Sequence, residues 1–429
     1  MTIIIGAGIS GLALAWYMQK ADKPYILLEA EDNPGGYIRT KQQNGYILEL
    51  GPNSLICDEH TLSFLKETGL YEEIVPANEV SKSRFIYKNG KYQKLPDNPI
   101  SLLSSSFFSM SSKMSILGEF FKKPNIDPNE SVATFFRRRF SQEVVEYAVK
   151  PFIAGIYSGD AEDLLISETF PTLHQMEKDH GSILKGFIKN KTGRKQSITF
   201  RKGMQMLTDK VASQLKGLRC NAKAEAIYKE GQGYKVCWDE KGNKEDATCK
   251  NVVLALPAMH ASQLFRFNSP LPDVLKKIDY VPVTVVHSVY EKASVQSDLN
   301  GFGALHPQKE NLFTSGTIWS SSLFAERCPK DKVLLTSFIR QCTDKEKEKE
   351  VLQKVHKELS NNLLINKEPI FKNIKVWEKA IPQYNINYKN ARYEIEKAAG
   401  ENMFIATNWY KGVSIPDCIK KAADLAGNL

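Results

Sequence analysis

The sequence predicts an α/β fold with a parallel sheet near its N-terminal end, and three local patterns support this. Thr2–Ile5 is a β-branched run that is typical of a strand buried on both faces. The helical stretch that follows begins with glycines in the spacing G-x-G-x-x-G, at Gly6, Gly8 and Gly11. The next apolar run, residues 24–28, ends in Glu29. This order of strand, glycine turn, helix, strand and acid is that of a Rossmann-like dinucleotide-binding unit.

Each part of this unit has a physical role. Gly6 allows the tight turn, Gly8 lets the backbone approach a pyrophosphate, and Gly11 lets the helix pack closely on the strand. The helix N-terminus offers N–H groups and the positive end of its dipole to the phosphates. Glu29 stands at the distance expected for the acid that binds an adenosine ribose, and an unrelated glycine-rich turn would not need it. We expect further cofactor contacts from the neighbours Ala7, Ile9, Ser10 and Ala30.

Length and composition restrict the class of protein. A chain of 429 residues is long for one core, so we expect two or three domains. Its hydrophobic fraction of 42% and charged fraction of 25% are those of a soluble globular protein. The net charge of +9 is spread along the chain, which argues against nucleic acid and leaves anionic lipid or an acidic substrate as partners.

Cysteine usage and the start of the chain bear on the compartment. The seven cysteines form no C-x-x-C pair, which argues against a disulfide framework or a metal site and favours a reducing compartment. The first predicted strand begins at Thr2, so no signal or transit peptide is expected. No apolar run reaches the roughly 18 residues that a membrane-spanning helix needs. We therefore expect a cytoplasmic protein without a metal ion.

The stretch after Glu29 narrows the choice of cofactor. It reads Asn33-Pro34-Gly35-Gly36-Tyr37-Ile38-Arg39-Thr40 and resembles the second fingerprint of a large superfamily of FAD-binding oxidoreductases. That superfamily includes amine oxidases, phytoene desaturases and protoporphyrinogen oxidases. The resemblance implies FAD instead of NAD, with Gly36 and Tyr37 at the cofactor. Residues 45–50 read as a strand, which leads into a loop that runs close to the flavin ring in the resembling proteins: Gly51, Pro52, Asn53 and Ser54.

Three further elements are predicted before the middle of the chain. Residues 59–74 have the apolar periodicity of one amphipathic helix, and residues 83–95 read as a hairpin with Asn-Gly at its turn. Residues 98–125 hold an apolar run that could dip into a lipid interface. A helical lid packed on the rest of the protein is the alternative, and the two are compatible. The run extends from Leu102 to Phe121, includes Phe107 and Phe108, and is bounded by Lys122 and Lys123.

A second set of motifs makes the resemblance narrower. Residues 151–160 read Pro-Phe-x-x-Gly-x-Tyr-x-Gly-Asp, and Gly-Ser-Ile follows at residues 181–183. Both resemble the protoporphyrinogen oxidase family much more than the amine oxidases. The stretches 301–307, 316–324 and 381–384 extend the resemblance over nearly the whole chain. A charged helix over residues 344–361 is predicted to be a solvated face.

The C-terminal stretch, residues 404–419, resembles the last flavin-binding segment of that family. There, N–H groups at a helix start meet the pyrimidine end of the flavin ring and can stabilise negative charge. Thr407 stands where the family usually has glycine, and Cys418 is not placed like the cysteine that binds flavin covalently in some amine oxidases. We therefore expect non-covalent FAD. The resemblance assigns further cofactor contacts to Ala224, through its backbone, and to Trp409, Val413, Ser414 and Ile415.

The resemblance also implies a substrate site for a bulky apolar macrocycle that carries propionates. Arg84 matches the position that pairs with a propionate, and Leu305, Ile318 and Phe338 match positions that sandwich the macrocycle. Gly155 matches a glycine whose carbonyl faces the reacting carbon, so Gly155 and Phe338 are the expected catalytic positions. A surface arginine, core residues and a turn glycine would look the same in the sequence. The family often has a glycine pair after Phe338, where this chain has Arg340 and Gln341.

These patterns predict a flavoenzyme in three parts. The FAD-binding domain takes residues 1–80, 199–258 and 396–429, a mixed α+β substrate domain takes 81–97 and 259–395, and a helical lid or membrane-binding domain takes 98–198. The expected reaction is oxidation of protoporphyrinogen IX to protoporphyrin IX in heme biosynthesis, with oxygen as acceptor and release of hydrogen peroxide. Coproporphyrinogen III, which has four propionates instead of two, is the nearest alternative. Amine oxidation and a redox-silent FAD scaffold are more distant ones. Peripheral contact with the cytoplasmic face of an anionic membrane, and a homodimer, are further expectations.

Overall fold

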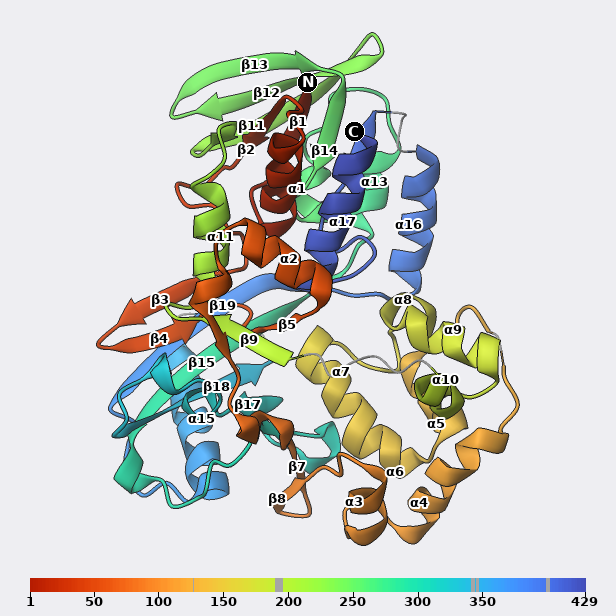
Figure 1. Cartoon of the computed structure of the whole chain (residues 1–429), viewed down its shortest axis with the longest axis vertical. Coiled ribbons are helices and arrows are strands. Elements are labelled where there is room, and N and C mark those ends of the chain that lie inside the picture. The colour runs from red at the N-terminus through yellow and green to blue at the C-terminus, as the bar shows by residue number, and fades with distance from the viewer. Residues whose placement is uncertain (126, 190–195, 341–343, 345–346, 399–401) are drawn as a thin grey trace.

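The computed structural model describes the whole chain except residues 126, 190–195, 341–343, 345–346 and 399–401. Figure 1 shows a parallel sheet with its helices at one end of the long axis. A second large sheet lies beside a group of helices at the other end. Strands and helices mix in this way along the whole chain, which confirms the predicted α/β class with a mixed second part.

Five parallel strands form the first sheet, in the order β10-β2-β1-β14-β20. All residues of the two central strands β1 and β14 are buried, as expected where both faces of a sheet are covered. Helices α1 (Ile9–Lys20) and α17 (Ile415–Asn428) pack side by side on one face, and the antiparallel sheet β11-β12-β13 covers the other. The bounds are β1 Thr2–Ile5, β2 Tyr25–Leu28, β10 Leu218–Arg219, β11 Ala222–Glu230, β12 Gly233–Glu240, β13 Asn243–Cys249, β14 Asn251–Leu254 and β20 Met403–Ile405.

Seven strands form the second sheet, in the order β19-β15-β18-β17-β16-β7-β8. The predicted hairpin is confirmed as β7 and β8, and its turn residues Asn89 and Gly90 both have positive φ, at 55° and 81°. A two-residue turn of that kind matches the twist of the strands that it joins. The bounds are β7 Phe85–Lys88, β8 Lys91–Lys94, β15 Tyr280–Glu291, β16 Gly303–Leu305, β17 Gly316–Ile318, β18 Lys332–Ile339 and β19 Phe371–Pro382.

Helix α15 (Glu348–Leu363) covers one face of this sheet. The prediction of a solvated helix over residues 344–361 was wrong for one side of it. Four apolar residues at helical spacing pack against strands β15 and β18, namely Val351, Val355, Leu359 and Leu363. An apolar stripe on a charged helix is enough to attach it to a sheet.

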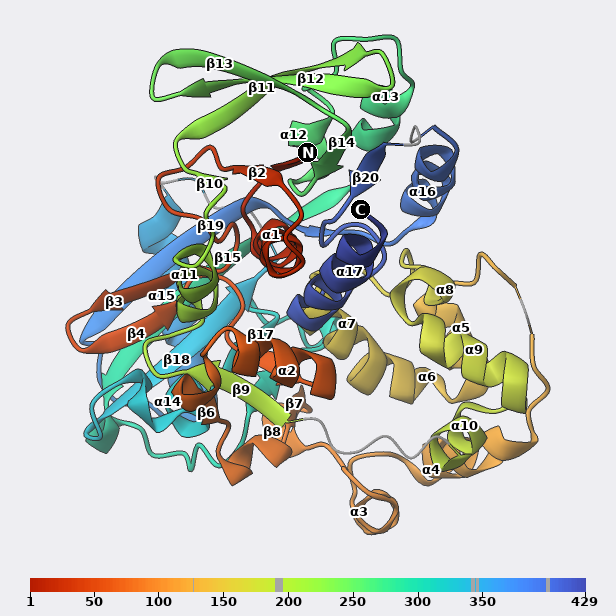
Figure 2. The same ribbon diagram turned by 45° about the horizontal axis from the view of Figure 1, so that its top comes forward.

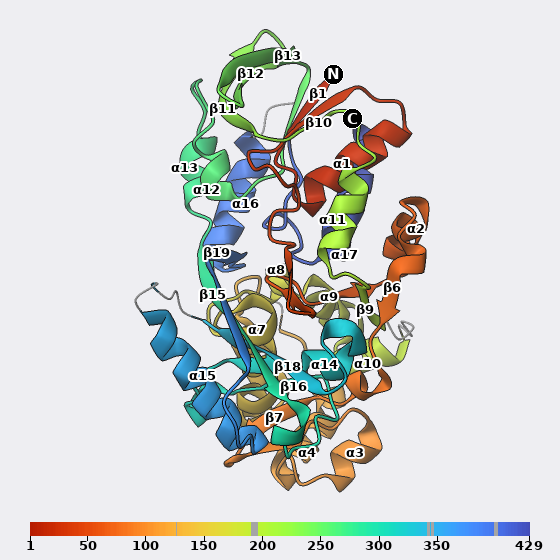
Figure 3. The ribbon, with the colours of Figure 1, turned by 90° about the vertical axis from the view of Figure 1, so that its left-hand side faces the viewer.

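The predicted helix over residues 59–74 was also wrong, because it is broken near its middle. Helix α2 ends at Glu67, and Gly69 then adopts a φ of +74° that a helix does not continue. A short 3₁₀ turn, Tyr71–Glu73, leads into strand β6 (Ile74–Pro76), which pairs with β9 (Gln196–Phe200). Figure 3 shows α2 lying beside α11 (Gln205–Ala212) and α17, with β6 and β9 below it. The apolar residues of this stretch therefore serve a helix and a strand.

Short helices from α3 to α10 form the third part (Figure 2). The prediction that Phe107 and Phe108 face lipid was wrong, because they are only 2% and 6% exposed and pack in the helical core with Val132 and Phe135. Other residues of the run do face outward, as described below. The bounds are α3 Pro99–Ser104, α4 Met110–Leu117, α5 Val132–Arg139, α6 Gln142–Val144, α7 Lys150–Tyr157, α8 Ile166–Thr169, α9 Pro171–His180 and α10 Ile183–Lys189.

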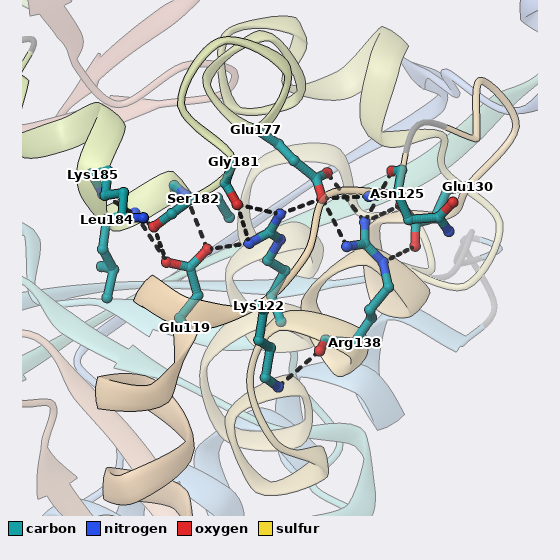
Figure 4. A network of polar contacts seen from close by, with 12 residues as sticks. Glu119, Lys122, Asn125, Glu130, Arg138, Glu177, Gly181, Ser182, Leu184 and Lys185 are labelled. Atoms are coloured by element: carbon teal, nitrogen blue, oxygen red, sulfur yellow. Dashed lines mark hydrogen bonds and ion pairs between the residues drawn. The ribbon is translucent and has the colours of Figure 1, made fainter.

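A buried ionic network holds these helices together (Figure 4). Arg139 on α5 is fully buried and forms ion pairs with Glu119 (2.7 Å) and Glu177. Glu119 also accepts hydrogen bonds from the hydroxyl of Ser182 and from the backbone N–H of Ile183, at 2.9 Å for the latter. The Gly-Ser-Ile motif at residues 181–183 therefore starts α10 on a buried carboxylate.

Several of the remaining helices pack in the cores around the first sheet. Within the described part of the chain, no helix combines the length and the apolar character needed to cross a bilayer. The remaining strands and α-helices of more than three residues are β3 Thr40–Gln43, β4 Tyr46–Glu49, α2 Glu59–Glu67, α11 Gln205–Ala212, α12 Ala258–Ala261, α13 Leu271–Lys276, α14 Ser320–Leu323 and α16 Ile386–Ala398. Strand β5, Leu55–Cys57, completes a small sheet with β6 and β9.

Candidate functional site

The glycine turn between β1 and α1 has one glycine that faces open space. A Cβ on Gly6 would lie 2.8 Å from the carbonyl oxygen of Ala255, and one on Gly11 would lie 2.0 Å from that of Gly6. A Cβ on Gly8 would meet nothing within 4 Å. The first and third glycines are therefore required by packing, whereas the second leaves room beside the N-terminus of α1. The arrangement fits a pyrophosphate. Ala7, Ile9 and Ser10 are buried around it.

Glu29 directly follows β2, next to this turn. Its carboxylate accepts hydrogen bonds from the N–H of Ala7 at 2.8 Å and from the N–H of Glu31 at 3.0 Å. These two bonds fix the carboxylate and leave lone pairs available, since a carboxylate has about four acceptor sites. Glu29 is half-buried and Ala30 is exposed, so a ribose hydroxyl could reach the acid from solvent.

The glycine pair Gly35-Gly36 lies against the glycine turn between β1 and α1. The N–H of Gly35 donates to the carbonyl oxygen of Ala7 at 2.8 Å, and a Cβ on Gly36 would lie 3.4 Å from the Cα of Gly8. The fold therefore brings together two motifs that only the resemblance had linked. Tyr37 follows them, packs edge-on against the Trp377 ring at 5.2 Å, and donates its hydroxyl hydrogen to the carbonyl of Lys379. Burial raises the pKa of Tyr37 to about 12, so the hydroxyl remains a neutral donor.

A buried ion pair, which the sequence analysis did not predict, lies next to the predicted flavin loop. That loop consists of Gly51, Pro52, Asn53 and Ser54. Glu49 and Arg327 are 3% exposed each, and their charged atoms lie 2.6 Å apart. Glu49 also accepts from the Thr40 hydroxyl at 2.6 Å and from the N–H of Met204 at 2.9 Å. Burial raises the pKa of Glu49 and the charge of Arg327 opposes that shift. A carboxylate in an apolar strand just before the loop was the available signal for a buried cation.

The C-terminal segment wraps around a lysine that was also missed. The ammonium of Lys421 on α17 donates to the carbonyl oxygens of Thr407 (2.6 Å), Tyr410 and Gly412 (2.9 Å). Burial lowers its pKa. Three carbonyls turned toward one cation fix the path of the chain between β20 and α17. No pattern of nearby residues in the sequence signals such a contact.

The predicted flavin residues of this segment lie close together in the chain but differ in their surroundings. Trp409 is fully buried and donates from its indole N–H to the carbonyl of Leu256 at 3.0 Å. Ser414 is the N-cap of α17 in a capping box with Asp417, so the helix start is well defined before Ile415. Val413 is half-buried between them. The segment fits a ligand that approaches a helix N-terminus.

Two residues of this region bear on the cofactor. Thr407 is 3% exposed, and its hydroxyl has no hydrogen-bond partner among the described residues. A buried unpaired hydroxyl is unfavourable in the free protein and fits a polar ligand atom nearby. Cys418 is 1% exposed and burial raises the pKa of its thiol, so it packs as a small uncharged side chain. Ala224 lies at a bulge of β11 and packs against the same apolar cluster as Trp409.

The predicted substrate residues gather on one face of the second sheet. Leu305 on β16 pairs with Gly316 on β17, which pairs with Phe338 on β18, so these positions form one row. Ile318 lies two residues from Gly316 and hence on the same face. All three apolar side chains are half-buried. Gly155 on α7 faces this row, because a Cβ there would lie 3.0 Å from Cδ2 of Leu305.

Arg84 stands at the edge of the same face. Ile86 pairs with Leu305, and Arg84 precedes it by two residues, which places it on the same side of the hairpin. Its guanidinium lies 5.3 Å from the centre of the Phe302 ring. The residue is exposed as a whole, but the atoms packed around the guanidinium lower its pKa by desolvation and leave it charged. It has no salt bridge with the described residues.

The comparison with protein families agrees with this geometry. The model described as flavin containing amine oxidoreductase matches residues 9–428. Protoporphyrinogen oxidase 2 of Arabidopsis thaliana is 31% identical over 473 residues, covering 98% of this chain and 92% of that protein. Coproporphyrinogen III oxidase of Bacillus subtilis is 27% identical over 453 residues, covering 97% and 95%.

Solved structures share the fold at lower identity. A crystal structure from Exiguobacterium sp. 255-15 has a TM-score of 0.81 and 22% identity, and covers 100% of this chain and 98% of its own. A putrescine oxidase with bound putrescine has a TM-score of 0.72 and 16% identity, with coverage of 100% and 98%. A reduced UDP-galactopyranose mutase has a TM-score of 0.74 and 14% identity, with coverage of 100% and 96%.

Proposed function

The chain belongs to the family of flavin-containing amine oxidoreductases, with FAD as its cofactor, and we propose that it oxidises a porphyrinogen to a porphyrin. One observation carries this proposal: Leu305, Ile318 and Phe338 form an apolar face that ends at the charged Arg84. A flat apolar macrocycle with ionised side arms needs such a surface. A small amine would need neither the breadth of the face nor the guanidinium.

Protoporphyrinogen IX is the first candidate substrate. Six relatives named protoporphyrinogen oxidase are 29–31% identical over almost the whole chain. Arg84 suits a propionate at the edge of this macrocycle, because a planar guanidinium binds one carboxylate with two parallel hydrogen bonds. Coproporphyrinogen III is the second candidate, since relatives from Bacillus subtilis and Staphylococcus aureus carry that name at 27% and 25% identity.

The residues of this chain would bind and orient the reactants. The glycine turn and Glu29 would hold the adenosine end of FAD, while the start of α17 would meet the pyrimidine end of its ring. Bound FAD supplies an acceptor for hydride. Oxygen would then reoxidise the reduced cofactor with release of hydrogen peroxide. The apolar face would exclude water, and Arg84 would fix the orientation of the macrocycle. Gly155 lacks a side chain, so its backbone could lie close to the reacting carbon.

Anaerobic mixing tests the reaction. The purified holoprotein is mixed with protoporphyrinogen IX, with coproporphyrinogen III and with putrescine, and the absorbance of oxidised flavin is followed. We expect bleaching with a porphyrinogen and none with the amine, and release of peroxide when oxygen is admitted. Bleaching by putrescine alone would indicate an amine oxidase, and no bleaching in protein that retains FAD would indicate a redox-silent scaffold. Either result contradicts the proposal.

Peripheral association with an anionic membrane is the second part of the proposal. Large apolar side chains on α3, α4 and the turn after them face solvent, with exposed fractions of 80% for Ile100, 69% for Met110 and 88% for Phe121. Lys123 is exposed next to the last of these. Helices α3 and α4 lie together at the end of the molecule that is opposite the parallel sheet (Figure 1). An apolar tip beside a cation suits an interface of anionic lipid.

A further inference from the structure

A second guanidinium lies on the face that holds the predicted substrate residues. Arg340 follows Phe338 by two residues at the end of β18, so it continues on the same side of the sheet. Its Nη1 atom lies 3.5 Å from the carbonyl oxygen of Gly159, in the segment that follows Gly155 and α7. The side chain therefore reaches from the sheet toward the lid. In the resembling family a glycine often stands here.

The electrostatic surroundings of Arg340 leave it without a matched anion. The residue is half-buried and forms no salt bridge with the described residues. Burial lowers its pKa, and the charge of Asp160 opposes that shift only in part. A partly desolvated guanidinium with a single long hydrogen bond to a carbonyl raises the free energy of the folded protein, unless a further anion pairs with it. Such a site suits a carboxylate ligand.

The two arginines stand at opposite corners of the apolar face. The strand order β7-β16-β17-β18 separates them by three strand spacings, or about 14 Å at about 4.8 Å each. The register aligns Arg84 with Gly303, Ile318 and Thr336, so Arg340 lies four residues further along, or about 13 Å. Leu305, Ile318 and Phe338 lie between the two corners. A macrocycle on this face would have opposite edges near the two guanidiniums.

We propose that Arg340 is a second propionate-binding residue and that it selects a porphyrinogen with propionates on opposite edges. This inference rests on the proposed porphyrinogen oxidation. Coproporphyrinogen III has a propionate on each of its four rings and would engage both Arg84 and Arg340. Protoporphyrinogen IX carries its two propionates on neighbouring rings and would engage Arg84 alone. If Arg340 has this role, coproporphyrinogen III becomes the favoured substrate, ahead of protoporphyrinogen IX, which the identities of the relatives alone place first.

Equilibrium binding of the stable oxidised macrocycles tests the inference without turnover. Coproporphyrin III and protoporphyrin IX are titrated into the holoprotein and followed by porphyrin fluorescence. Arg340→Ala and Arg340→Gln should raise the dissociation constant of coproporphyrin III at least tenfold and that of protoporphyrin IX less than twofold. Arg84→Ala should raise the dissociation constants of both porphyrins. Arg201→Ala, which removes a 62% exposed arginine outside this face, is the matched control and should change neither.

The outcomes separate this inference from the proposed function. Arg340 variants that bind both porphyrins like the wild type, or that lose both equally, overturn the role of Arg340 and leave the porphyrinogen proposal standing. A wild type that binds neither porphyrin, and whose flavin neither porphyrinogen bleaches, overturns the proposed function. Flavin absorbance and melting temperature are measured for each variant. If Arg340→Ala loses FAD, Arg340→Gln and Arg340→Lys decide, because Arg340→Lys keeps the charge and should recover part of the coproporphyrin binding.

Discussion

At the scale of single residues, the ammonium of Lys421 has the largest expected effect on the cofactor segment. It donates to three carbonyl oxygens of the chain between β20 and α17. Lys421→Met should leave those carbonyls unpaired and raise the dissociation constant of FAD at least tenfold, since bonds to a charged group contribute about 1.5–3 kcal/mol each. Titration of the apoprotein with FAD measures this. Lys420→Met, which changes the exposed neighbour, should bind FAD like the wild type.

Arg84 is expected to act on the substrate and not on the flavin. Its loss should remove a charge-assisted contact of about 1.5–3 kcal/mol, so Arg84→Ala should raise KM for a porphyrinogen by about ten- to a hundredfold. The turnover number should change less if the contact persists in the transition state. Arg84→Lys should recover only part, because it lacks the planar fork. Steady-state kinetics at equal FAD content check this, and unchanged kinetics in Arg84→Ala would remove the residue from the site.

His287 predicts a dependence of stability on pH. It is fully buried against the carbonyl of Glu49 at 3.0 Å, and burial lowers its pKa to about 4 from an ordinary value of 6.5. The unfolded chain therefore binds more protons between about pH 4 and pH 6.5, and stability falls as the pH falls through that window. The contribution is at most about 1.4 kcal/mol per pH unit. The free energy of unfolding, measured with urea at several pH values, should depend less steeply on pH in His287→Gln. Equal pH dependence in the variant and the wild type would contradict this.

At the scale of elements, the network around Arg139 holds α5, α9 and α10 together. Arg139→Met leaves Glu119 buried without its cation and leaves Glu177 paired with Arg138 alone, which should destabilise the helical part by about 3–5 kcal/mol. Arg137→Met is the matched control on the same helix, because its pair with Glu162 is about 40% exposed on each side and should cost less than about 1 kcal/mol. Thermal unfolding followed by circular dichroism compares them. Equal melting temperatures would mean that the network contributes little.

The outward face of α3 and α4 is the element that should contact lipid. Phe121→Asp and Ile100→Asp place charges at the two most exposed apolar positions of that tip and should release the protein from vesicles of anionic lipid. Tyr228→Asp changes an aromatic residue on β11 that is 43% exposed at the other end of the molecule, and should leave binding unchanged. Flotation of the vesicles measures the bound fraction. Equal flotation of all variants would show that the exposed apolar side chains of this tip do not bind the protein to lipid.

At the scale of the whole molecule, strand β19 joins the predicted cofactor site to the sheet of the substrate site. It lies at the edge of the second sheet, and Trp377 within it donates to the carbonyl of Leu50 at 2.6 Å, directly before the flavin loop. Lys379 on the same strand accepts the hydroxyl of Tyr37 through its carbonyl. Figure 3 shows β19 and β15 running between the two ends of the molecule. Two sites built on different sheets are thereby held in a fixed relation.

Much of the fold could be read from the sequence because its signals are local. The strand Thr2–Ile5, the glycines after it and the hairpin turn at Asn89-Gly90 each depend on residues within a few positions of one another. Backbone sterics and side-chain periodicity determine such elements almost independently of the rest of the chain. The resemblance then supplied candidates such as Arg84 and Phe338, and the register of β7, β16, β17 and β18 gathers them on one face.

Tertiary structure alone decided which charges and rings are buried. Glu49 meets Arg327 and Thr407 meets Lys421 through contacts that no local pattern encodes, because the partners come from separate elements. The apolar run near Phe107 was misread because its periodicity shows that a side is apolar and not whether protein or lipid covers it. Sequence thus determined the dinucleotide fold and the elements with local signals, such as strand Thr2–Ile5 and the hairpin, but not the break after Glu67. Burial and charge pairing depend on long-range packing, which local sequence does not record.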